Sequence, residues 1–276
     1  MEIRFEHSPK EVSKMNTKEL REAFLMKKLM KEDEITYIYS HYDRLITGGV
    51  KPVYKAVELV NHPELRAEYF LERREIGIIN VGGNGTVIAD GQTFELAKQS
   101  CLYLSKGTKE VAFKSNDVNS PALFFLLSSP AHATSENRLM HKEEASPVAL
   151  GSQETANKRT VYKYIHLDGI RSCQLVMGLT VLEKGSVWNS IPPHTHTRRT
   201  EVYFYFDVPE DQRVFHYMGE PEETRHIVMK DHEAVVSPPW SIHCGSGTSN
   251  YGFIWGMAGE NQVYSDMDAV AVIDMK

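Results

Sequence analysis

Apolar residues along most of the chain recur in short runs that are separated by turns rich in glycine, asparagine and aspartate. Typical runs are Ile35–Tyr39, Ile76–Val81 and Val202–Phe206, in which β-branched and aromatic residues dominate. Such runs favour strands, and turn residues about every 8–12 positions are typical of a β-sandwich or a β-barrel. The sequence therefore predicts a mainly β fold.

Glycine-containing pairs mark the expected turns. We expect a turn at Gly48–Gly49 and a hairpin turn at Gly82–Gly85, which lacks the lysine and hydroxyl residue of a phosphate-binding loop. Asp90–Gly91 follows the expected strand Thr86–Ala89 and predicts a type I′ hairpin turn.

Helical periodicity is confined to the start of the chain. Asn16 precedes Glu19 by three residues, which is the spacing of a capping box. Leu20 and Phe24 then recur at helical spacing. We expect one short N-terminal helix that continues to Met30.

Composition excludes several classes of protein. No apolar run approaches the ~20 residues of a membrane span, and the start of the chain lacks the apolar segment of a secretory signal. The net charge of −6 gives no basic surface for nucleic acid. The three cysteines have no paired spacing, which fits a reducing compartment. We therefore expect a cytoplasmic protein that binds neither membrane nor nucleic acid.

The chain is expected to consist of two halves. The segment Ser129–Gly151 holds two prolines and a mostly polar middle, which is typical of a linker. Arg73–Ile76 and Arg199–Val202 each place a glutamate before an apolar run, a weak similarity that leaves internal duplication open. We expect two β units, residues 1–135 and residues 136–276.

Histidines cluster in the second half, where six of the twelve lie between residues 194 and 243. On extended backbone, His194 and His196 point to the same face. Glu201 opens a strand on which Tyr203 shares its face, and His243 follows a Pro-Pro turn about 40 residues later. Three imidazoles and one carboxylate suit Zn²⁺, Fe²⁺, Mn²⁺, Ni²⁺ or Co²⁺.

The segments around these residues resemble the two motifs of the cupin superfamily, in which His, His, Glu and His lie inside a small β-barrel. The sequence is more closely similar to the 4-deoxy-L-threo-5-hexosulose-uronate ketol-isomerase family. The matching segments in the second half are His194–Phe206, Glu223–Met229, Trp240–His243, Phe253–Met257 and Gly259–Gln262. The resemblance covers nearly the whole chain and includes Tyr39–Arg44, Tyr69–Glu75 and Lys106–Val111 in the first half.

The resemblance implies a bicupin: two cupin-like barrel or sandwich units with a short N-terminal helix. It places one Zn²⁺ per subunit in the second half, with His194, His196, Glu201 and His243 as ligands. The first half departs from the metal pattern, because no His-x-His precedes Glu75 and Glu110 stands where the second motif has its histidine. That half is therefore expected to be metal-free. Members of the family form homo-oligomers, commonly hexamers.

The implied activity is an aldose–ketose isomerisation of a small uronate-derived molecule. The substrate would be 5-dehydro-4-deoxy-D-glucuronate and the product 3-deoxy-D-glycero-2,5-hexodiulosonate, a step of pectin and polyuronate catabolism. Glu201 and Tyr203 are the candidate catalytic residues. The candidate substrate-binding residues in the matching segments are Arg199, Arg225, His226 and Trp240.

Three other readings stay open at this point. A 5-deoxy-glucuronate isomerase of inositol catabolism shares the chemistry and differs in substrate. A metal-dependent dioxygenase would hold Fe²⁺ and consume oxygen. A non-catalytic sugar-acid-binding cupin would bind its ligand without turnover.

Overall fold

The computed structural model describes all 276 residues and groups them into two compact units. The N-terminal unit comprises Met1–Arg4, Lys28–Ser146 and Lys163–Met177. The C-terminal unit comprises Phe5–Lys27, Pro147–Tyr162 and Gly178–Lys276. The N-terminal unit therefore includes a short segment from the second half of the chain, Lys163–Met177, and the C-terminal unit includes one from the start of the chain, Phe5–Lys27. The boundary expected between residues 135 and 136 stays a prediction.

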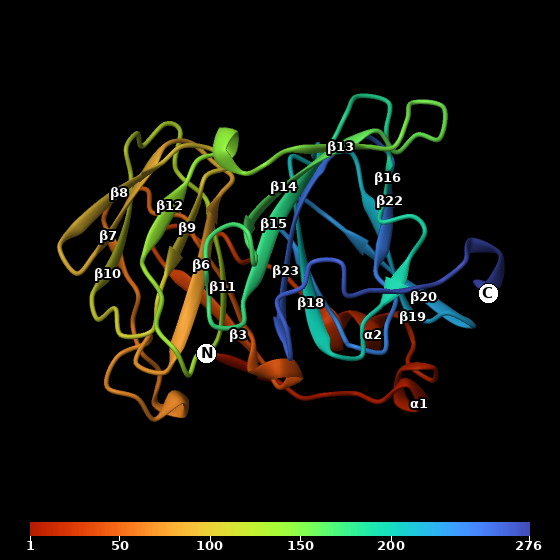
Figure 1. The fold of residues 1–276 in the computed structure, drawn as a ribbon, viewed down its shortest axis with the longest axis horizontal. Helices are drawn as coiled ribbons and strands as arrows, with labels where there is room; N and C mark the ends of the chain where they lie inside the picture. The colour runs from red at the N-terminus through yellow and green to blue at the C-terminus, as the bar shows by residue number, and fades with distance from the viewer. The chain divides into compact units, whose positions relative to one another are not determined.

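The N-terminal unit is a sandwich of a large and a small sheet (Figure 1). The large sheet has the order β1 (Glu2–Arg4), β3 (Ile35–Ser40), β4 (Ile46–Val50), β11 (Phe124–Pro130), β6 (Arg74–Asn80), β9 (Cys101–Leu104) and β12 (Arg138–Met140). The small sheet has the order β5 (Val57–Glu58), β10 (Val111–Ser115), β7 (Gly85–Ala89) and β8 (Gln92–Leu96). Apolar side chains from both sheets, including Ile76, Ile78, Phe113 and Phe124, form one buried core.

The sheets of the second half repeat this arrangement. The large sheet has the order β13 (Val148–Leu150), β14 (Arg159–Ile165), β15 (Val176–Leu182), β23 (Gly252–Gly259), β18 (Arg199–Phe206), β21 (Ala234–Ser237) and β2 (Leu25–Met26). The small sheet has the order β16 (Trp188–Asn189), β22 (Cys244–Gly247), β19 (Val214–Glu220) and β20 (Glu223–Met229). A separate two-stranded sheet pairs β17 (His194–Thr195) with β24 (Asp268–Ala269).

The strand orders match one to one along the chain. In the large sheets, β3, β4, β11, β6 and β9 correspond to β14, β15, β23, β18 and β21. In the small sheets, β5, β10, β7 and β8 correspond to β16, β22, β19 and β20. This shared connectivity supports the internal duplication that the sequence left open, and the predicted mainly β fold is confirmed.

The N-terminal helix begins where the sequence predicted. Asn16 caps α2 (Thr17–Phe24), and its side chain accepts from the Glu19 amide while Glu19 bonds back to the Asn16 amide. The expected continuation to Met30 is wrong, because Leu25 and Met26 form β2 and pair with β21 instead. A second, shorter helix was not predicted; it is α1 (Pro9–Val12), which Ser8 caps. Four 3₁₀ turns complete the helical elements: Tyr42–Arg44, Pro63–Leu65, Lys142–Glu144 and Val272–Asp274.

The expected turn at Gly48–Gly49 is wrong, and the expected linker 129–151 differs from the structure. Gly48 and Gly49 lie inside β4 rather than in a turn. A Cβ at either would lie within 2.8 Å of a backbone oxygen, so glycine serves close packing here. The expected linker 129–151 contains β12 and β13, which pair with β9 and β14. By contrast, the hairpin at Asp90–Gly91 is confirmed, since both residues have positive φ between β7 and β8.

Glu75 and Glu201 precede similar apolar runs, but Glu75 does not face the interior of its unit as Glu201 does. Ile76 and Ile78 face the sandwich core, so strand alternation turns Glu75 to the opposite face of β6. Its buried carboxylate accepts from the Tyr103 hydroxyl at 2.7 Å and from Ser129 at 3.1 Å. It also accepts from the backbone amides of residues 173, 174 and 175 at 2.6–2.8 Å. Glu75 thus attaches the segment 173–175 to the sheet of the N-terminal unit.

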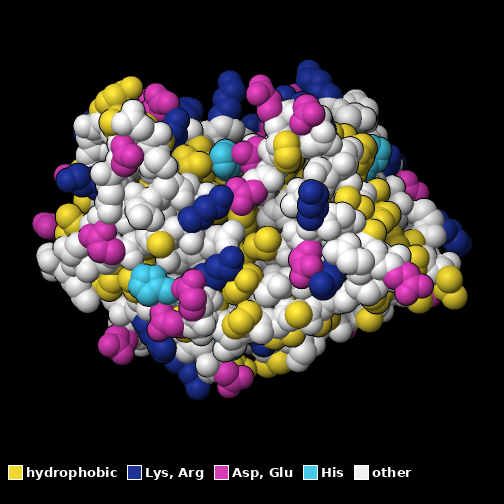
Figure 2. Space-filling model, turned by 90° about the horizontal axis from the view of Figure 1, so that it is seen from above, with side chains coloured by type: hydrophobic (Ala, Val, Ile, Leu, Met, Phe, Trp, Pro, Cys, Tyr) yellow, Lys and Arg dark blue, Asp and Glu magenta, His cyan; other side chains and the backbone are white.

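The exposed side chains carry both signs of charge. Figure 2 shows acidic and basic side chains interspersed over the visible face. Glu110, expected in place of a metal-binding histidine, is an exposed residue of this kind. None of the helices has the length and apolar character that crossing a bilayer requires.

Replacing Glu75 with alanine tests its structural role. The change leaves one buried amide, two partly buried amides and two buried hydroxyls without their acceptor, so Glu75→Ala should lower the free energy of unfolding by about 3 kcal/mol or more. The matched control Glu110→Ala removes an exposed carboxylate and should change it by less than about 0.5 kcal/mol. Urea unfolding of the full chain measures both, and equal stability of the two variants would contradict this role.

Candidate metal centre and active-site cavity

Four side chains with metal-binding atoms meet in the C-terminal unit. His194 lies in β17, His196 follows it, Glu201 lies in β18, and His243 directly precedes β22. One ligand atom from each lies within 4.8 Å of all the others. His196, Glu201 and His243 are buried, whereas His194 is partly exposed. The structure therefore brings together the four residues that the sequence predicted as ligands.

The contacts within this cluster have hydrogen-bond length and join atoms that carry lone pairs. Glu201 Oε2 lies 2.9 Å from His196 Nε2 and 2.8 Å from His243 Nε2. His243 Nε2 also lies 2.9 Å from His194 Nε2. The Nδ1 atom of His196 donates to the Arg199 carbonyl at 3.0 Å, which leaves Nε2 of the neutral ring with a lone pair. The lone pairs that converge here require either added protons or a cation.

Burial and charge shift the pKa values of the cluster in opposite directions. Burial, and then the neighbouring His243, lower the pKa of His194 to about 3. Burial also acts to lower the pKa of His196, but the hydrogen bond and charge of Glu201 outweigh it and raise that pKa. Burial acts to raise the pKa of Glu201, yet His243 and His196 hold it well below the usual range. At neutral pH the cluster therefore presents an ionised carboxylate and at least one neutral imidazole.

The donor set fits a divalent ion. A tetrahedral ion with bonds of about 2.1 Å separates its ligand atoms by about 3.4 Å, and the ligand atoms here are 2.8–4.8 Å apart. Two histidines are oriented by backbone carbonyls, His196 by that of Arg199 and His243 by that of Ser241 at 3.4 Å. Carbonyl acceptors on Nδ1 hold Nε2 free for an ion, as is usual around metal-binding histidines.

The cluster borders a cavity of about 240 Å³ in the C-terminal unit. His194, Glu201 and Tyr203 contribute polar atoms to its wall. The apolar part of the wall includes Phe253, Trp255 and Met257. Trp255 and Met257 were not among the predicted site residues; both are buried residues of β23 that also line this cavity. A cavity that joins an apolar wall to a few polar groups is typical of small-molecule sites.

Tyr203 presents a protonated phenol to the cavity. Its hydroxyl lies 2.8 Å from Ser190 Oγ, which orients it. Burial, followed by the negative charge of Glu201, raises the pKa of Tyr203 well above its ordinary value. Behind it, the Tyr205 hydroxyl lies 2.9 Å from His216 Nδ1, and burial lowers the pKa of His216 to about 3. The lining behind the cluster is thus polar but uncharged.

Arg159 is a cavity residue that was not predicted from the sequence. It opens β14 and lines the same cavity as Glu201 and Tyr203. Its Nη1 donates to the Asn157 carbonyl at 2.9 Å, and Nε and Nη2 have no partner in the chain. Burial lowers its pKa, but a guanidinium stays charged at neutral pH. The sequence offered one indication of this position: Arg159 lies two residues before Val161 on a strand, so the two side chains share a face, and both line the cavity.

Arg199, predicted to bind substrate, forms hydrogen bonds with backbone carbonyls of this chain. Its buried guanidinium donates to the carbonyls of Val263 at 2.8 Å and Asp266 at 2.7 Å. The neighbouring Arg198 forms an ion pair with Asp266 at 2.6 Å. Both arginines therefore hold the segment that contributes Tyr264 to the cavity wall. The substrate-binding role of Arg199 stays a prediction.

The other predicted substrate residues lie outside the wall of this cavity. Arg225 donates to the Ser13 carbonyl and lies 3.6 Å from Glu223. His226 is exposed on β20, and Trp240 is partly exposed. The structure does not gather these three residues at the metal cluster, and their assignment to substrate binding stays a prediction.

Comparisons with known proteins agree over the whole chain. The model of the KduI/IolB family matches residues 24–272. A 4-deoxy-L-threo-5-hexosulose-uronate ketol-isomerase of Shouchella clausii is 52% identical over 276 residues, which is all of both chains. A protein of the same name from Yersinia pseudotuberculosis is 50% identical over 278 residues, again covering both chains fully.

Solved structures with low sequence identity share the fold. An IolB-like protein from Salmonella typhimurium LT2 has a TM-score of 0.73 at 14% identity, covering 90% of this chain and 96% of its own. The oxalate decarboxylase of Lactobacillus farciminis in complex with formate has a TM-score of 0.56 at 10% identity, covering 83% and 79%. With the sheets described above, these neighbours confirm the expected pair of cupin-like units.

Removing one ligand should strongly weaken metal binding. His243→Ala deletes an imidazole from the centre of the cluster and should weaken Zn²⁺ binding by about 100-fold or more. His226→Ala removes an exposed histidine outside the cluster and serves as the matched control. Elemental analysis after dialysis against Zn²⁺ measures both, and full metal content in His243→Ala would contradict the cluster's role.

The same centre should release its ion in acid. A protonated His196 cannot bind a metal, and in the metal-free chain its pKa is raised above the ordinary value. Affinity should therefore rise with pH through that pKa and fall steadily below about pH 6.5. A Zn²⁺ titration from pH 5 to pH 8, run with a fluorescent chelator as competitor, follows this dependence.

Proposed function

The chain belongs to the KduI/IolB family, and from that premise we propose that it isomerises 5-dehydro-4-deoxy-D-glucuronate to 3-deoxy-D-glycero-2,5-hexodiulosonate. It is a ketol-isomerase, an intramolecular oxidoreductase. The observation that carries the substrate assignment is the convergence of the histidine–glutamate cluster, the Tyr203 hydroxyl and the Arg159 guanidinium on one cavity. The cluster suits binding of the substrate carbonyl through a metal ion, the Tyr203 hydroxyl suits proton transfer, and the Arg159 guanidinium suits binding of the substrate carboxylate.

The reaction moves a proton between neighbouring carbons. The substrate carries an aldehyde beside a hydroxyl-bearing carbon, and its far end is a keto acid. A base removes the proton of the hydroxyl-bearing carbon, giving an enediol, and an acid returns a proton to the former carbonyl carbon. A proton also passes from the hydroxyl oxygen to the former carbonyl oxygen, in the same sense as the transfer between the carbons, so the atoms and electrons balance within one molecule.

We propose Zn²⁺ as the ion, held by His194, His196, Glu201 and His243. When bound, it supplies Lewis acidity that makes the proton beside the carbonyl easier to remove. Fe²⁺, Mn²⁺, Ni²⁺ and Co²⁺ suit the same donors. The carbonyls of Arg199 and Ser241 keep two of the imidazoles oriented for this task.

Glu201 and Tyr203 are the proposed proton-transfer residues. Glu201 is ionised at neutral pH, and because its Oε2 faces His196 and His243 as the ligand atom, Oε1 is the oxygen proposed to accept the proton. Tyr203 is protonated and can donate one. Both lie on the same face of β18 and both line the cavity. The Ser190 hydroxyl orients the phenol and offers a partner for its proton during transfer.

Arg159 is the proposed partner of the substrate carboxylate. Two of its nitrogens are free of protein partners, and its partly buried position strengthens an ionic hydrogen bond. Binding the carboxylate there would fix the orientation of the open chain in the cavity. The wall formed by Phe253 and Trp255 would contact the carbon atoms and exclude water.

The wider setting follows from the substrate. We propose a role in pectin and polyuronate catabolism, in the cytoplasm and as a homo-oligomer such as a hexamer. The N-terminal unit is proposed to be metal-free, because apolar side chains such as Ile76 and Phe113 fill its core. These statements rest on the family and on the roughly 50% identity to the ketol-isomerases.

The deciding experiment is a turnover assay by proton NMR. Freshly prepared 5-keto-4-deoxyuronate should lose its aldehyde signals in the presence of the Zn²⁺-loaded protein, and treatment with a chelator should stop this until Zn²⁺ is restored. Turnover of 5-deoxy-glucuronate instead would move the protein to the inositol pathway. Binding of either compound without turnover by a folded, metal-loaded sample would establish a sugar-acid-binding protein, and oxygen consumption a dioxygenase.

Two variants separate chemistry from binding in this assay. Tyr203→Phe removes the phenolic proton and should lower kcat by about 100-fold with unchanged metal content. Arg159→Gln should raise KM by about 10-fold or more with a smaller effect on kcat. Arg171→Gln, at an exposed arginine outside the cavity, is the matched control. A Tyr203→Phe enzyme with full kcat would remove Tyr203 from the mechanism.

A further inference from the structure

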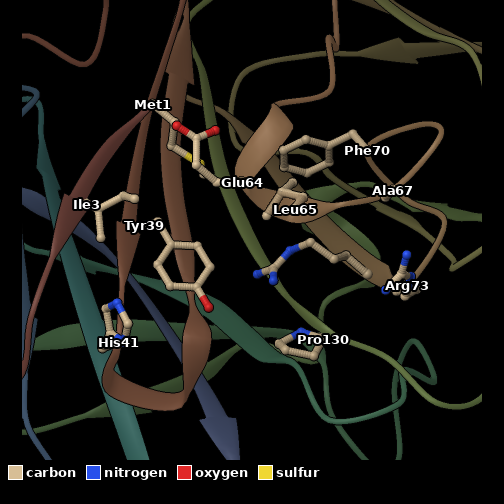
Figure 3. A pocket seen from close by; sticks show the side chains of 11 residues that line it. Met1, Ile3, Tyr39, His41, Glu64, Leu65, Ala67, Phe70, Arg73 and Pro130 are labelled. Carbon is tan, nitrogen blue, oxygen red and sulfur yellow. The ribbon is translucent and has the colours of Figure 1, made fainter.

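A second cavity lies wholly within the N-terminal unit (Figure 3). Its volume is about 320 Å³, which is within the range of small-molecule sites, roughly 300–1,000 Å³. Tyr39, Arg74 and Phe70 line it, with Leu65, Arg73 and Glu64. None of these residues belongs to the metal cluster or to its cavity.

The two cavities take residues from corresponding strands of the duplicated fold. The catalytic cavity takes residues from β14, β18 and β23. The N-terminal cavity takes Tyr39 from β3, Arg74 from β6 and Pro130 from β11, which are the three corresponding strands.

Arg74 is the buried cation of this cavity. Its Nε donates to Ser128 Oγ at 3.0 Å, and its Nη2 donates to the carbonyls of Ser128 at 2.8 Å and Arg44 at 2.7 Å. These contacts fix the guanidinium plane. Its Nη1 has no hydrogen-bond partner in the chain and is not sealed from solvent. Arg74 is only 6% exposed, so Nη1 is a fixed, partly desolvated hydrogen-bond donor that carries positive charge.

The surroundings of Arg74 favour a small anion that carries hydroxyl groups. The Tyr39 hydroxyl has no partner in the chain and, in Figure 3, points into the cavity. Phe70 and Leu65 form an apolar wall, against which the carbon atoms of a sugar ring can pack. Glu64 on the rim is exposed and disfavours ligands of high negative charge. Arg73, also exposed, adds positive charge beside Arg74.

We propose that this cavity is a second, metal-independent binding site whose ligand is a small monocarboxylate sugar acid, with its carboxylate on Arg74 Nη1 and a hydroxyl on Tyr39. The site does not depend on the isomerase assignment, because it shares no residue with the catalytic cavity. It would place a non-catalytic site for a hexuronate in the half of the chain that lacks the metal cluster.

Calorimetric titration of the full chain with D-galacturonate tests the proposal. The titration uses the Arg159→Gln variant, so that binding in the catalytic cavity is weakened. Saturable binding should appear, and D-galactose, which lacks the carboxylate, should not bind. Adding Arg74→Gln should weaken the binding by about 10-fold or more, and adding Tyr39→Phe by about 3-fold or more.

Tyr39→Phe keeps the test decisive even where Arg74→Gln does not fold. It removes only a hydroxyl that has no partner in the chain, and circular dichroism and thermal unfolding check the fold of each variant. The proposal is overturned by an absence of saturable binding up to about 10 mM, which corresponds to less than about 3 kcal/mol of binding free energy. Binding that is unchanged in both folded variants overturns it as well.

Discussion

The carboxylate of Glu201 among three imidazoles is the interaction on which the functional half depends. Its Oε2 lies within 2.9 Å of two histidine nitrogens, and a third nitrogen lies 2.9 Å from one of these. Lone pairs held this close in a buried site repel one another unless a positive charge joins them. The surrounding elements can be understood as the means of holding this arrangement: β18 carries the glutamate, β17 carries one histidine, and backbone carbonyls orient the others.

The segment near the C-terminus is part of the same construction. Its strand β24 pairs with β17, which carries His194. Arg199 and Arg198 bond to residue 266 of this segment, and Tyr264 within it closes the cavity wall. Arg199, a candidate for substrate contact, and its neighbour Arg198 therefore stabilise the wall against which substrate is proposed to bind. The guanidinium that lines the cavity with two unbonded nitrogens is that of Arg159, on another strand.

One fold serves two purposes along the chain. The same strand order produces a polar interior with ligating side chains in one unit and an apolar core in the other. Glu75, adjacent in sequence to the core residue Ile76, faces away from the core and binds three backbone amides. A shift of one residue along a strand reverses the face of a side chain, so similar sequences around Glu75 and Glu201 have different roles.

The sequence alone determined the mainly β class, the capped start of α2, the hairpin at Asp90–Gly91 and the four residues of the cluster. The first three features depend on local alternation and on capping and turn chemistry, and the four cluster residues on the spacing of two sequence motifs that resemble those of cupins. Only the tertiary structure decided that Gly48 lies in a strand, that Glu75 faces away from its core, and that Arg159 lines the cavity. Each of these depends on contacts between segments far apart in the chain, which local patterns do not encode.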